Sequence, residues 1–455
     1  MRQRKSTFSA LFILLIGLSI EAFAQESPRE NNLQRKWTLR ECIDYAIEHN
    51  IGIREQALTV KEAKTALKTT RSSRLPDLDA ELNQDFSFGH SQSSSTGIFQ
   101  KNQAANTGFS LSSQTPIFSG FRIKHQTRAD QFNLKAEIES LHHAKENVEL
   151  HVTALYLDVL FRSELEDVYK EQTEHANRMT ERTQALVEAG VLSYSQLLEM
   201  KAESAKILLN QTEAANEKKQ SLLNLAHSLN ISNREDFDIA APSAEIRIGH
   251  ITKPDEVYQI ARNERPVIKE AEYRLKSSRS GVYAARSGYY PTINLNLAYI
   301  TGYDHIYNGT APNRSFPKQL SDNQREIIGL TMHIPLFNRN ATINNVRTAR
   351  LQSEKRKLEL ENAHLELYKE IEQAYQNAIL AVVQLMASEE ASEAASEASY
   401  YTRERYKEGL STVYEYSETE TKLLSASSAL LQAKYELLFR NKILDFYQGI
   451  PITLE

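Results

Sequence analysis

The 455-residue chain has a single cysteine, Cys42. One thiol cannot form a disulfide within a subunit, so the fold does not depend on such cross-links. Beyond the N-terminal region the sequence also lacks the run of about 18 apolar residues that a membrane helix needs. The nearest candidate, 378–387, is short and includes Gln384. A formal charge of −5 and a mean hydropathy of −0.50 give no reason to expect nucleic-acid binding.

The signatures of common enzyme sites are missing too. The sequence has no HExxH, no GxSxG and no phosphate-binding glycine loop. Its 12 histidines are scattered, and the tightest group, His142, His143 and His151, has no carboxylate arrangement suited to a metal. We therefore expect neither an enzyme nor a bound metal or cofactor.

The first 24 residues have the composition of an export signal. Three basic residues, Arg2, Arg4 and Lys5, precede the apolar run 8–20, and Ala22-Phe23-Ala24 offers small residues for cleavage. We expect a signal peptide over 1–24 and a polar segment over 25–37, with no cysteine at the cleavage site to accept a lipid. A membrane anchor is the alternative, but the apolar run is short for a span.

The rest of the chain contains two copies of one pattern. An offset of 215 places residues 38–82 over 253–297, and an offset of 219 places 116–231 over 335–450. The identical pairs include Glu41/Glu256, Ala46/Ala261, Pro76/Pro291, Tyr156/Tyr375 and Gly190/Gly409. The sequence therefore predicts two repeats, 38–231 and 253–450, a linker over 232–252 and a tail over 451–455.

Helical patterns dominate each repeat. Thr38 is a suitable N-cap for an opening helix that we expect to continue to Leu75, before Pro76. A longer pattern covers 121–189 and, in the second copy, 341–408, which corresponds to roughly 100 Å of helix. Its 4-3-4 seam is typical of a coiled coil. The seam residues are Val148, Val152, Leu155 and Val159, then Leu367, Ile371, Ala374 and Ala378, with Ala387, Ala391, Ala394 and Ala398 predicted to continue it.

Each long pattern ends at a glycine, Gly190 or Gly409, where a turn is expected because glycine tolerates positive φ. Ser193 and Thr412 can cap the returning helices, which run to about 230 and 448. The opening and returning helices together nearly equal the long helix. We therefore expect them to stack end to end beside it.

Between the opening and long helices the period changes from 3.6 to 2. Leu78, Ala80 and Leu82 alternate with polar residues, as do Ile293, Leu295 and Leu297. A second strand in each repeat is indicated near 109–112 and 328–334, after loops rich in Ser, Gln and Asn. Aromatic residues near the ends of these strands, each roughly 10 residues long, are typical of a membrane barrel, although a half-buried hairpin in a soluble sheet has the same alternation.

Four strands cannot close a barrel, and lipid does not tolerate open sheet edges. Several chains are therefore needed. Two would supply eight strands and three would supply twelve, and the wider barrel leaves more room for a lumen. The predicted fold class is mainly α with a small β part, with the long helices continuing from the barrel around a shared axis.

This order of elements resembles the TolC-like family of outer-membrane efflux proteins over nearly the whole mature chain. The resemblance also includes the strand-exit turns at Pro116 and Phe118 and at Pro335 and Phe337, and the tip turns at Gly190 and Gly409. It implies a homotrimer with a 12-stranded barrel in the outer membrane and a helical tunnel in the periplasm. It further implies docking to a periplasmic adaptor and an inner-membrane pump, for efflux or for type I secretion.

The resemblance also implies a gate at the periplasmic tip. In this family a tyrosine precedes the second-repeat glycine by three residues, and acids follow it by six and nine; here these are Tyr406, Glu415 and Glu418. The glutamates would form rings that favour cations. Better-studied members have a latching arginine two residues after the glycine. This chain has Ser411 there, which leaves Arg403 or Arg405 as candidates for the latch.

The alternative is a soluble periplasmic coiled-coil adaptor or scaffold without a barrel. That class predicts one coiled-coil hairpin beside a compact β domain, whereas this sequence predicts two complete units. Drug, metal, polypeptide and polysaccharide export all stay open as the transported substrate.

Overall fold

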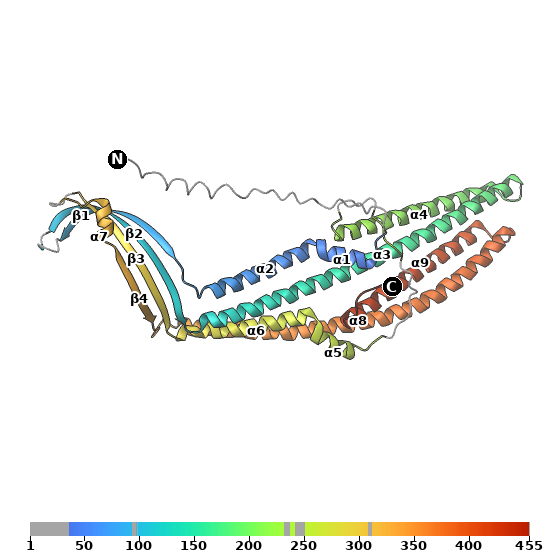
Figure 1. Ribbon diagram of the computed structural model, residues 1–455. Coiled ribbons are helices and arrows are strands. Elements are labelled where there is room, and N and C mark those ends of the chain that lie inside the picture. Colours follow the sequence, from blue (N-terminus) through green and yellow to red (C-terminus); the bar gives the residue numbers. More distant parts are fainter. Residues whose placement is uncertain are drawn as a thin grey trace.

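The fold is that of a computed structural model, which describes residues 36–92, 97, 99–231, 237–241, 251–307 and 312–454. Figure 1 shows an elongated molecule with a four-stranded sheet at one end and two helical hairpins at the other. The predicted signal peptide, the polar segment up to residue 35 and most of the linker 232–252 lie outside the described residues.

Three pairs of helices have the same bounds in the two repeats. Under the offset of 215, α1 (Leu39–His49) corresponds to α5 (Pro254–Glu264). Under the offset of 219, α3 (Arg122–Glu188) corresponds to α8 (Ala341–Lys407), and α4 (Tyr194–Ser228) to α9 (Val413–Tyr447). Residues with positive φ recur in the same way, as the pairs Gly120/Arg339, Phe121/Asn340, Gly190/Gly409 and Asn230/Gly449. The chain thus folds as two copies of one unit.

The opening helix of each repeat is two helices rather than the single one expected. α1 ends at His49, and α2 (Ile51–Ser72) follows Asn50, whose side-chain oxygen accepts a hydrogen bond of 3.2 Å from the backbone N–H of Ile53. In the second repeat Arg265 is extended and Pro266 begins α6 (Pro266–Arg286). An N-cap asparagine and an N1 proline both end the preceding helix. The expected end at Leu75 was also wrong, since α2 stops at Ser72.

One antiparallel sheet contains all four strands, β1 (Asp79–Gln92), β2 (Phe99–Ser119), β3 (Thr292–Ile306) and β4 (Arg325–His333), in that order. The register places Leu82 opposite Phe109, Leu111 opposite Tyr299, and Leu297 opposite Ile328. Large apolar residues therefore gather on one face and polar residues on the other. Three of the strands exceed the predicted 10 residues, and β2 has 21. β1 and β4 are the edges of this described sheet.

The two predicted strand-exit turns differ from each other. Pro335 and Phe337 follow the end of β4, as expected. Pro116 and Phe118 instead lie inside β2, on either side of a bulge. β2 continues to Ser119 because it stays paired with β3, whose Thr292 has Ser119 as its partner on one side and His333 on the other. The first motif is thus a bulge and not an exit.

A short helix, α7 (Phe316–Asp322), lies between β3 and β4 where only loop was expected. The Phe316 ring contacts those of Phe109 and Tyr303, and the Thr301 hydroxyl donates a 2.7 Å hydrogen bond to Leu320 O. Phe109 and Thr301 are register partners on the apolar face of the sheet. α7 therefore packs on the apolar face, near the end remote from the long helices (Figure 1).

The helices pack as coiled-coil pairs, as the seams predicted. α2 and α4 lie one after the other along α3, and α6 and α9 lie along α8 (Figure 1). The seam residues Val152, Val159, Ile371 and Ala378 are buried. The predicted continuation is wrong for a single chain, because Ala387, Ala391, Ala394 and Ala398 are exposed while Leu385 and Ser399 are buried. Among the described residues, no helix combines the length and apolarity needed to cross a membrane.

Candidate functional site

The turns at the far ends of both hairpins have the same construction. Gly190 and Gly409 have φ values of 73° and 71°, and each N–H donates 3.0 Å to a carbonyl three residues earlier. Apart from the adjacent residues of the chain, no atom lies within 4 Å of where a Cβ would be. Glycine is therefore favoured at these positions by the positive φ and not by a lack of space. Ser193 and Thr412 cap the returning helices, as expected.

Glu415 belongs to the cap of α9. Its carboxylate accepts hydrogen bonds from the Ser411 hydroxyl and, at 3.3 Å, from the backbone N–H of Thr412, which caps Glu415 N in return. The bonds from Ser411 and Thr412 lower the pKa of Glu415. Ser411, at the position where the sequence departs from the latching arginine of the family pattern, thus keeps the Glu415 carboxylate ionised at the turn of the hairpin.

Glu418 is exposed one turn further along α9. Its carboxylate forms a 2.7 Å ion pair with Lys422, and both side chains are largely in solvent. The exposed pair is weak, because water screens both charges. Glu415 and Glu418 therefore present carboxylates on the outside of this single chain.

Tyr406 is not the solvated helix end that its position near a turn would suggest. It is 6% exposed, its ring stacks on Tyr416 at 5.3 Å, and its hydroxyl lies 2.9 Å from the Thr183 hydroxyl of α3. Burial raises the pKa of Tyr406, so the phenol stays neutral. Met179 and Met200 complete an apolar cluster with these tyrosines and Val413. Tyr406 consequently joins the second-repeat hairpin to the first.

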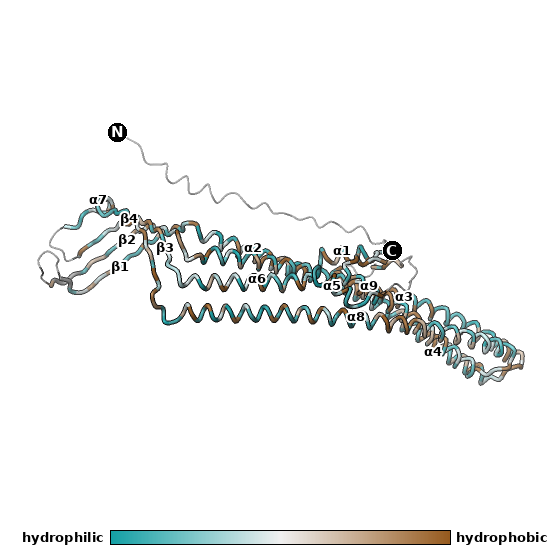
Figure 2. The backbone as a smooth tube through the Cα atoms, turned by 90° about the horizontal axis from the view of Figure 1, so that it is seen from below, coloured by the Kyte–Doolittle hydropathy of each residue, from teal (hydrophilic) through white to brown (hydrophobic). Residues whose placement is uncertain are grey.

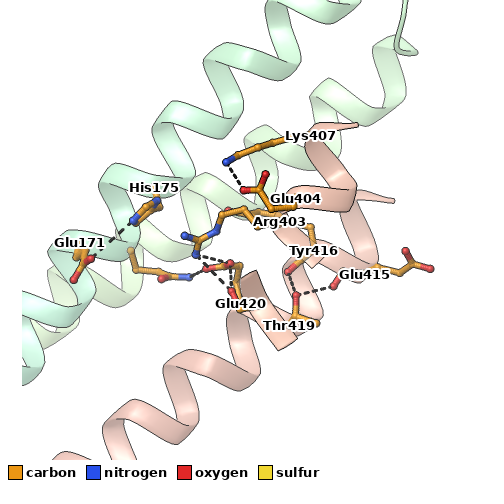
Figure 3. Close-up of polar contacts among 11 residues, drawn as sticks. Glu171, His175, Arg403, Glu404, Lys407, Glu415, Tyr416, Thr419 and Glu420 are labelled. Carbon is orange, nitrogen blue, oxygen red and sulfur yellow. Dashed lines mark hydrogen bonds and ion pairs between the residues drawn. The ribbon is translucent and has the colours of Figure 1, made fainter. Parts of the chain in front are cut away.

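A second connection between the hairpins lies one turn deeper and was missed by sequence reasoning. The Glu420 carboxylate, in a residue that is 2% exposed, accepts hydrogen bonds from Ser399 at 2.6 Å, Arg403 at 2.8 Å and Gln172 at 2.8 Å. Figure 3 shows Arg403 and Glu420 directed at each other, with His175 of α3 nearby. The available signal was an acid at helical spacing after the apolar residues Val413 and Tyr416.

The two arginines proposed as latch candidates have partners within the chain. Arg403 pairs with Glu420 at 2.8 Å, and its Nε atom is buried without a partner among the described residues. Arg405 donates to Leu410 O at 3.1 Å and so satisfies a carbonyl of the tip turn. Burial, together with nearby Arg403, lowers the pKa of His175, which keeps this imidazole neutral beside the arginine.

The described side chains at this site interact through hydrogen bonds, ion pairs and ring stacking. The described residues include no group of three or more His, Cys, Asp or Glu side chains placed to hold a metal ion. The tip brings together Tyr406 with Thr183 and Arg403 with Glu420, whereas Glu415 and Glu418 remain exposed.

Amphipathic strands joined in two repeats to long coiled-coil hairpins define the class of protein: a subunit of an outer-membrane channel. The chain belongs to the outer membrane efflux protein family, whose model matches residues 42–230 and 257–449. The family consists of efflux channels rather than enzymes, and the chain is accordingly a protein of the outer membrane.

Individual relatives have low sequence identity to this chain but align with most of its length. Outer membrane protein TolC of Salmonella enteritidis is 22% identical over 447 residues, which covers 96% of this chain and 86% of the relative. Cation efflux system protein CusC of Escherichia coli O157:H7 is 23% identical over 343 residues, covering 74% and 69%. A crystal structure of CusC matches with a TM-score of 0.75 and 18% identity, over 91% of this chain and 92% of that one, which shows the shared fold.

Proposed function

We propose that three copies of this chain form a channel-tunnel that serves as the exit duct of a tripartite efflux or type I secretion system. The observation that carries the proposal is the sheet, which has one apolar face and two free edges and is continuous with the long hairpins. Three such sheets supply twelve strands and remove every edge. The tunnel then continues through the hairpins into the periplasm.

The internal repeat supports a ring of subunits. In the chain, α6 packs between α3 and α8, whereas its counterpart α2 packs along α3 and has no comparable packing against α8 among the described residues. A ring of alternating repeats gives α2 its second neighbour, namely α8 of the next copy. Each contact between the repeats of one chain then predicts an equivalent contact across the subunit boundary.

One contact between α3 and α6 identifies exposed apolar residues that we expect to be covered at the subunit boundary. Phe132 of α3 stacks on Tyr273 of α6 at 6.5 Å. Under the two offsets, the equivalent boundary pair is Leu351 of α8 and the partner's Leu58 of α2. These leucines are 66% and 56% exposed in the single chain. Leu358 and Leu365 extend the exposed row at seven-residue intervals, and apolar residues recur along α8 in Figure 2. The row fits a subunit interface.

We place the gate at the tip, around Tyr406, Glu415 and Glu418. Threefold repetition turns the exposed carboxylates of Glu415 and Glu418 into rings, which favour cations and repel anions. Tyr406 holds the hairpin that carries them through its contacts with Tyr416 and Thr183. A wide, water-filled lumen discriminates little between substrates. We therefore assign the choice of substrate to the inner-membrane pump that delivers it.

Cross-linking in cells, followed by mass spectrometry of the complexes, tests this function. The expected products are a homotrimer in the outer membrane and adducts between the tip hairpins, a periplasmic adaptor and an inner-membrane pump. The trimer should withstand mild detergent and dissociate on heating. The rival assignment, a soluble adaptor or scaffold, requires release with the soluble periplasm, and that result would overturn the proposal.

A further inference from the structure

The parts of the helical framework next to the sheet are strongly basic. They hold 14 Lys and Arg residues and two acids, Glu62 and Asp130, whereas the whole chain has 54 basic and 59 acidic residues. The segments counted are 61–75, 122–135, 276–286 and 341–351. Positive charge is therefore concentrated where the sheet meets the helices (Figure 1).

Three aromatic rings mark the end of the apolar face of the sheet. Phe118 is the register partner of Ile293 and so shares that face. The Phe118 ring contacts Phe121 at 5.1 Å, and the Phe121 ring contacts Tyr290 at 6.1 Å. Such rings are typical of the boundary between the hydrocarbon and the headgroups of a membrane. They locate the level at which the helices leave the lipid.

The same side continues onto the helices as a row of rings and cations. One turn after the aromatic group, His125 of α3 stacks on Tyr283 of α6 at 5.4 Å. The Arg286 guanidinium lies 5.4 Å from the centre of the Tyr283 ring. Arg128 follows His125 by three residues, and its guanidinium lies 5.7 Å from the centre of the Phe132 ring. Arg128 and Arg286 thus lie on the side of the helices that is continuous with the apolar face.

The internal repeat supplies a second pair of arginines. The offset of 219 places Arg128 on Arg347 of α8, and the offset of 215 places Arg286 on Arg71 of α2. Arg71 and Arg347 are both exposed in the single chain. In a ring of alternating repeats, every junction between neighbouring repeats then has one arginine pair. Three chains would carry six such pairs around the outside of the tunnel.

Helix geometry places these arginines at the depth of the lipid phosphates. Arg286 precedes Tyr290 by four residues and Arg128 follows Phe121 by seven, which corresponds to about 6 and 10 Å along the helices. The headgroup layer of one leaflet is about 5–8 Å thick. The lysines further along the same segments lie about 16–21 Å from the rings, where a Debye length of about 8 Å screens them from the phosphates. These lysines are Lys61, Lys64, Lys135 and Lys276.

We propose that Arg71, Arg128, Arg286 and Arg347 form a collar that binds the phosphates of anionic phospholipids in the periplasmic leaflet of the outer membrane. The proposal rests on the trimeric channel above, whose sheets lie in that membrane. A guanidinium suits phosphate because it keeps its charge and donates two parallel hydrogen bonds. The neighbouring rings hold Arg128 and Arg286 in place through contacts with the ring faces. The collar thereby concentrates anionic lipid next to the channel.

Spin-labelled lipids test this contact. The parent trimer is reconstituted in phosphatidylcholine vesicles that contain a trace of spin-labelled phosphatidylglycerol or spin-labelled phosphatidylcholine. Electron paramagnetic resonance measures the fraction of each label that the protein immobilises. The arginine variant carries Arg71→Gln, Arg128→Gln, Arg286→Gln and Arg347→Gln. The matched lysine variant, which loses the same charge at greater depth, carries Lys61→Gln, Lys64→Gln, Lys135→Gln and Lys276→Gln.

The parent and the lysine variant should associate with phosphatidylglycerol about threefold or more tightly than with phosphatidylcholine, and the arginine variant should prefer neither lipid. Raising the salt to about 1 M should abolish the preference of the parent, because the Debye length falls to about 3 Å. The salt measurement needs no variant, so it tests the inference even if the arginine variant folds poorly.

Three results would overturn the inference: equal association of the parent with both lipids, an undiminished preference in the arginine variant, or an equal loss in the lysine variant. An altered ion selectivity of the arginine variant in planar bilayers, with unchanged lipid association, would place the arginines in the lumen and overturn it too. The proposed function fails separately, if the parent gives no heat-dissociable trimer before reconstitution.

Discussion

The guanidinium of Arg265 lies 2.8 Å from the carboxylate of Glu146 and joins the helix break of the second repeat to α3. The same guanidinium stacks on the Phe446 ring at 3.8 Å and donates to Phe446 O at 3.2 Å. The equivalent residue of the first repeat is Asn50, which caps α2 instead. Only the second repeat therefore has this charged connection to a neighbouring hairpin inside the chain.

Stability should depend on pH through Glu146. Burial is the main cause that raises the pKa of Glu146 from 4.5 to about 7, although Arg265 opposes the shift. Between those values the folded chain holds a proton that the unfolded chain releases. The stability due to this group is therefore complete below pH 4.5 and is lost as the pH rises through 7.

Replacing Glu146 by Gln should remove this dependence. The amide oxygen can still accept from Arg265, so the fall in stability from about pH 5 to pH 8 should shrink by about 1–3 kcal/mol. Thermal unfolding of the detergent-solubilised protein, followed by circular dichroism across that range, measures the change. Glu354→Gln, at a largely exposed position on α8, is the control and should leave the slope alone. Equal slopes for the parent and Glu146→Gln would contradict the assignment.

Local patterns were sufficient to predict most of the framework. The seam at Val152 and Ile371 and the caps at Ser193 and Thr412 depend on residues a few positions apart, so the sequence displays them directly. The break before Pro266 was also visible but was overlooked within a long helical pattern. α7 was missed because its seven residues are too few to show a period and its packing comes from Phe109 on another strand.

The tip could be predicted only in part, because some of its contacts join residues that are far apart in the sequence. Glu415 and Glu418 were identified through the family resemblance, which has acids six and nine residues after the glycine, and that they line a pore stays a prediction. Glu420 was not found because its burial depends on Gln172, which is 248 residues away in the sequence. A charged residue on a helix is normally solvated, and the helical spacing of Glu420 after Val413 and Tyr416 is too weak a signal to mark it as the exception.

The selectivity of the channel should follow the exposed carboxylates. Glu415→Gln removes the charge and keeps the cap, since Gln196 performs the same capping in the first repeat. Combined with Glu418→Ala, it should lower the cation preference about twofold or more in planar-bilayer recordings. Glu199→Ala, the equivalent of Glu418 on α4, is the matched control and should not alter the reversal potential. Unchanged selectivity in the double variant would count against these residues as the gate rings.

The subunit interface should include the leucine pair inferred from the repeat. Leu58→Cys and Leu351→Cys in one chain should react with a short thiol cross-linker to give dimers and trimers on a denaturing gel. Each single variant is a control and should stay monomeric after denaturation, because a lone thiol has no partner at that boundary. Monomers alone from the double variant, in a preparation that is trimeric before denaturation, would show that α2 and α8 meet at other residues.

The alternation of the sheet should be detectable in lipid vesicles. Trp37 is the only tryptophan in the sequence, so the Trp37→Phe variant has no tryptophan fluorescence of its own. The phenylalanine keeps an aromatic ring between Tyr45 and Phe237. On β3, Leu295→Trp lies on the apolar face and Asn296→Trp on the polar face. Brominated acyl chains should quench the fluorescence at position 295 strongly, whereas iodide in the buffer should quench at position 296. Equal quenching at the two positions would be inconsistent with a barrel wall that has lipid on one side and a water-filled lumen on the other.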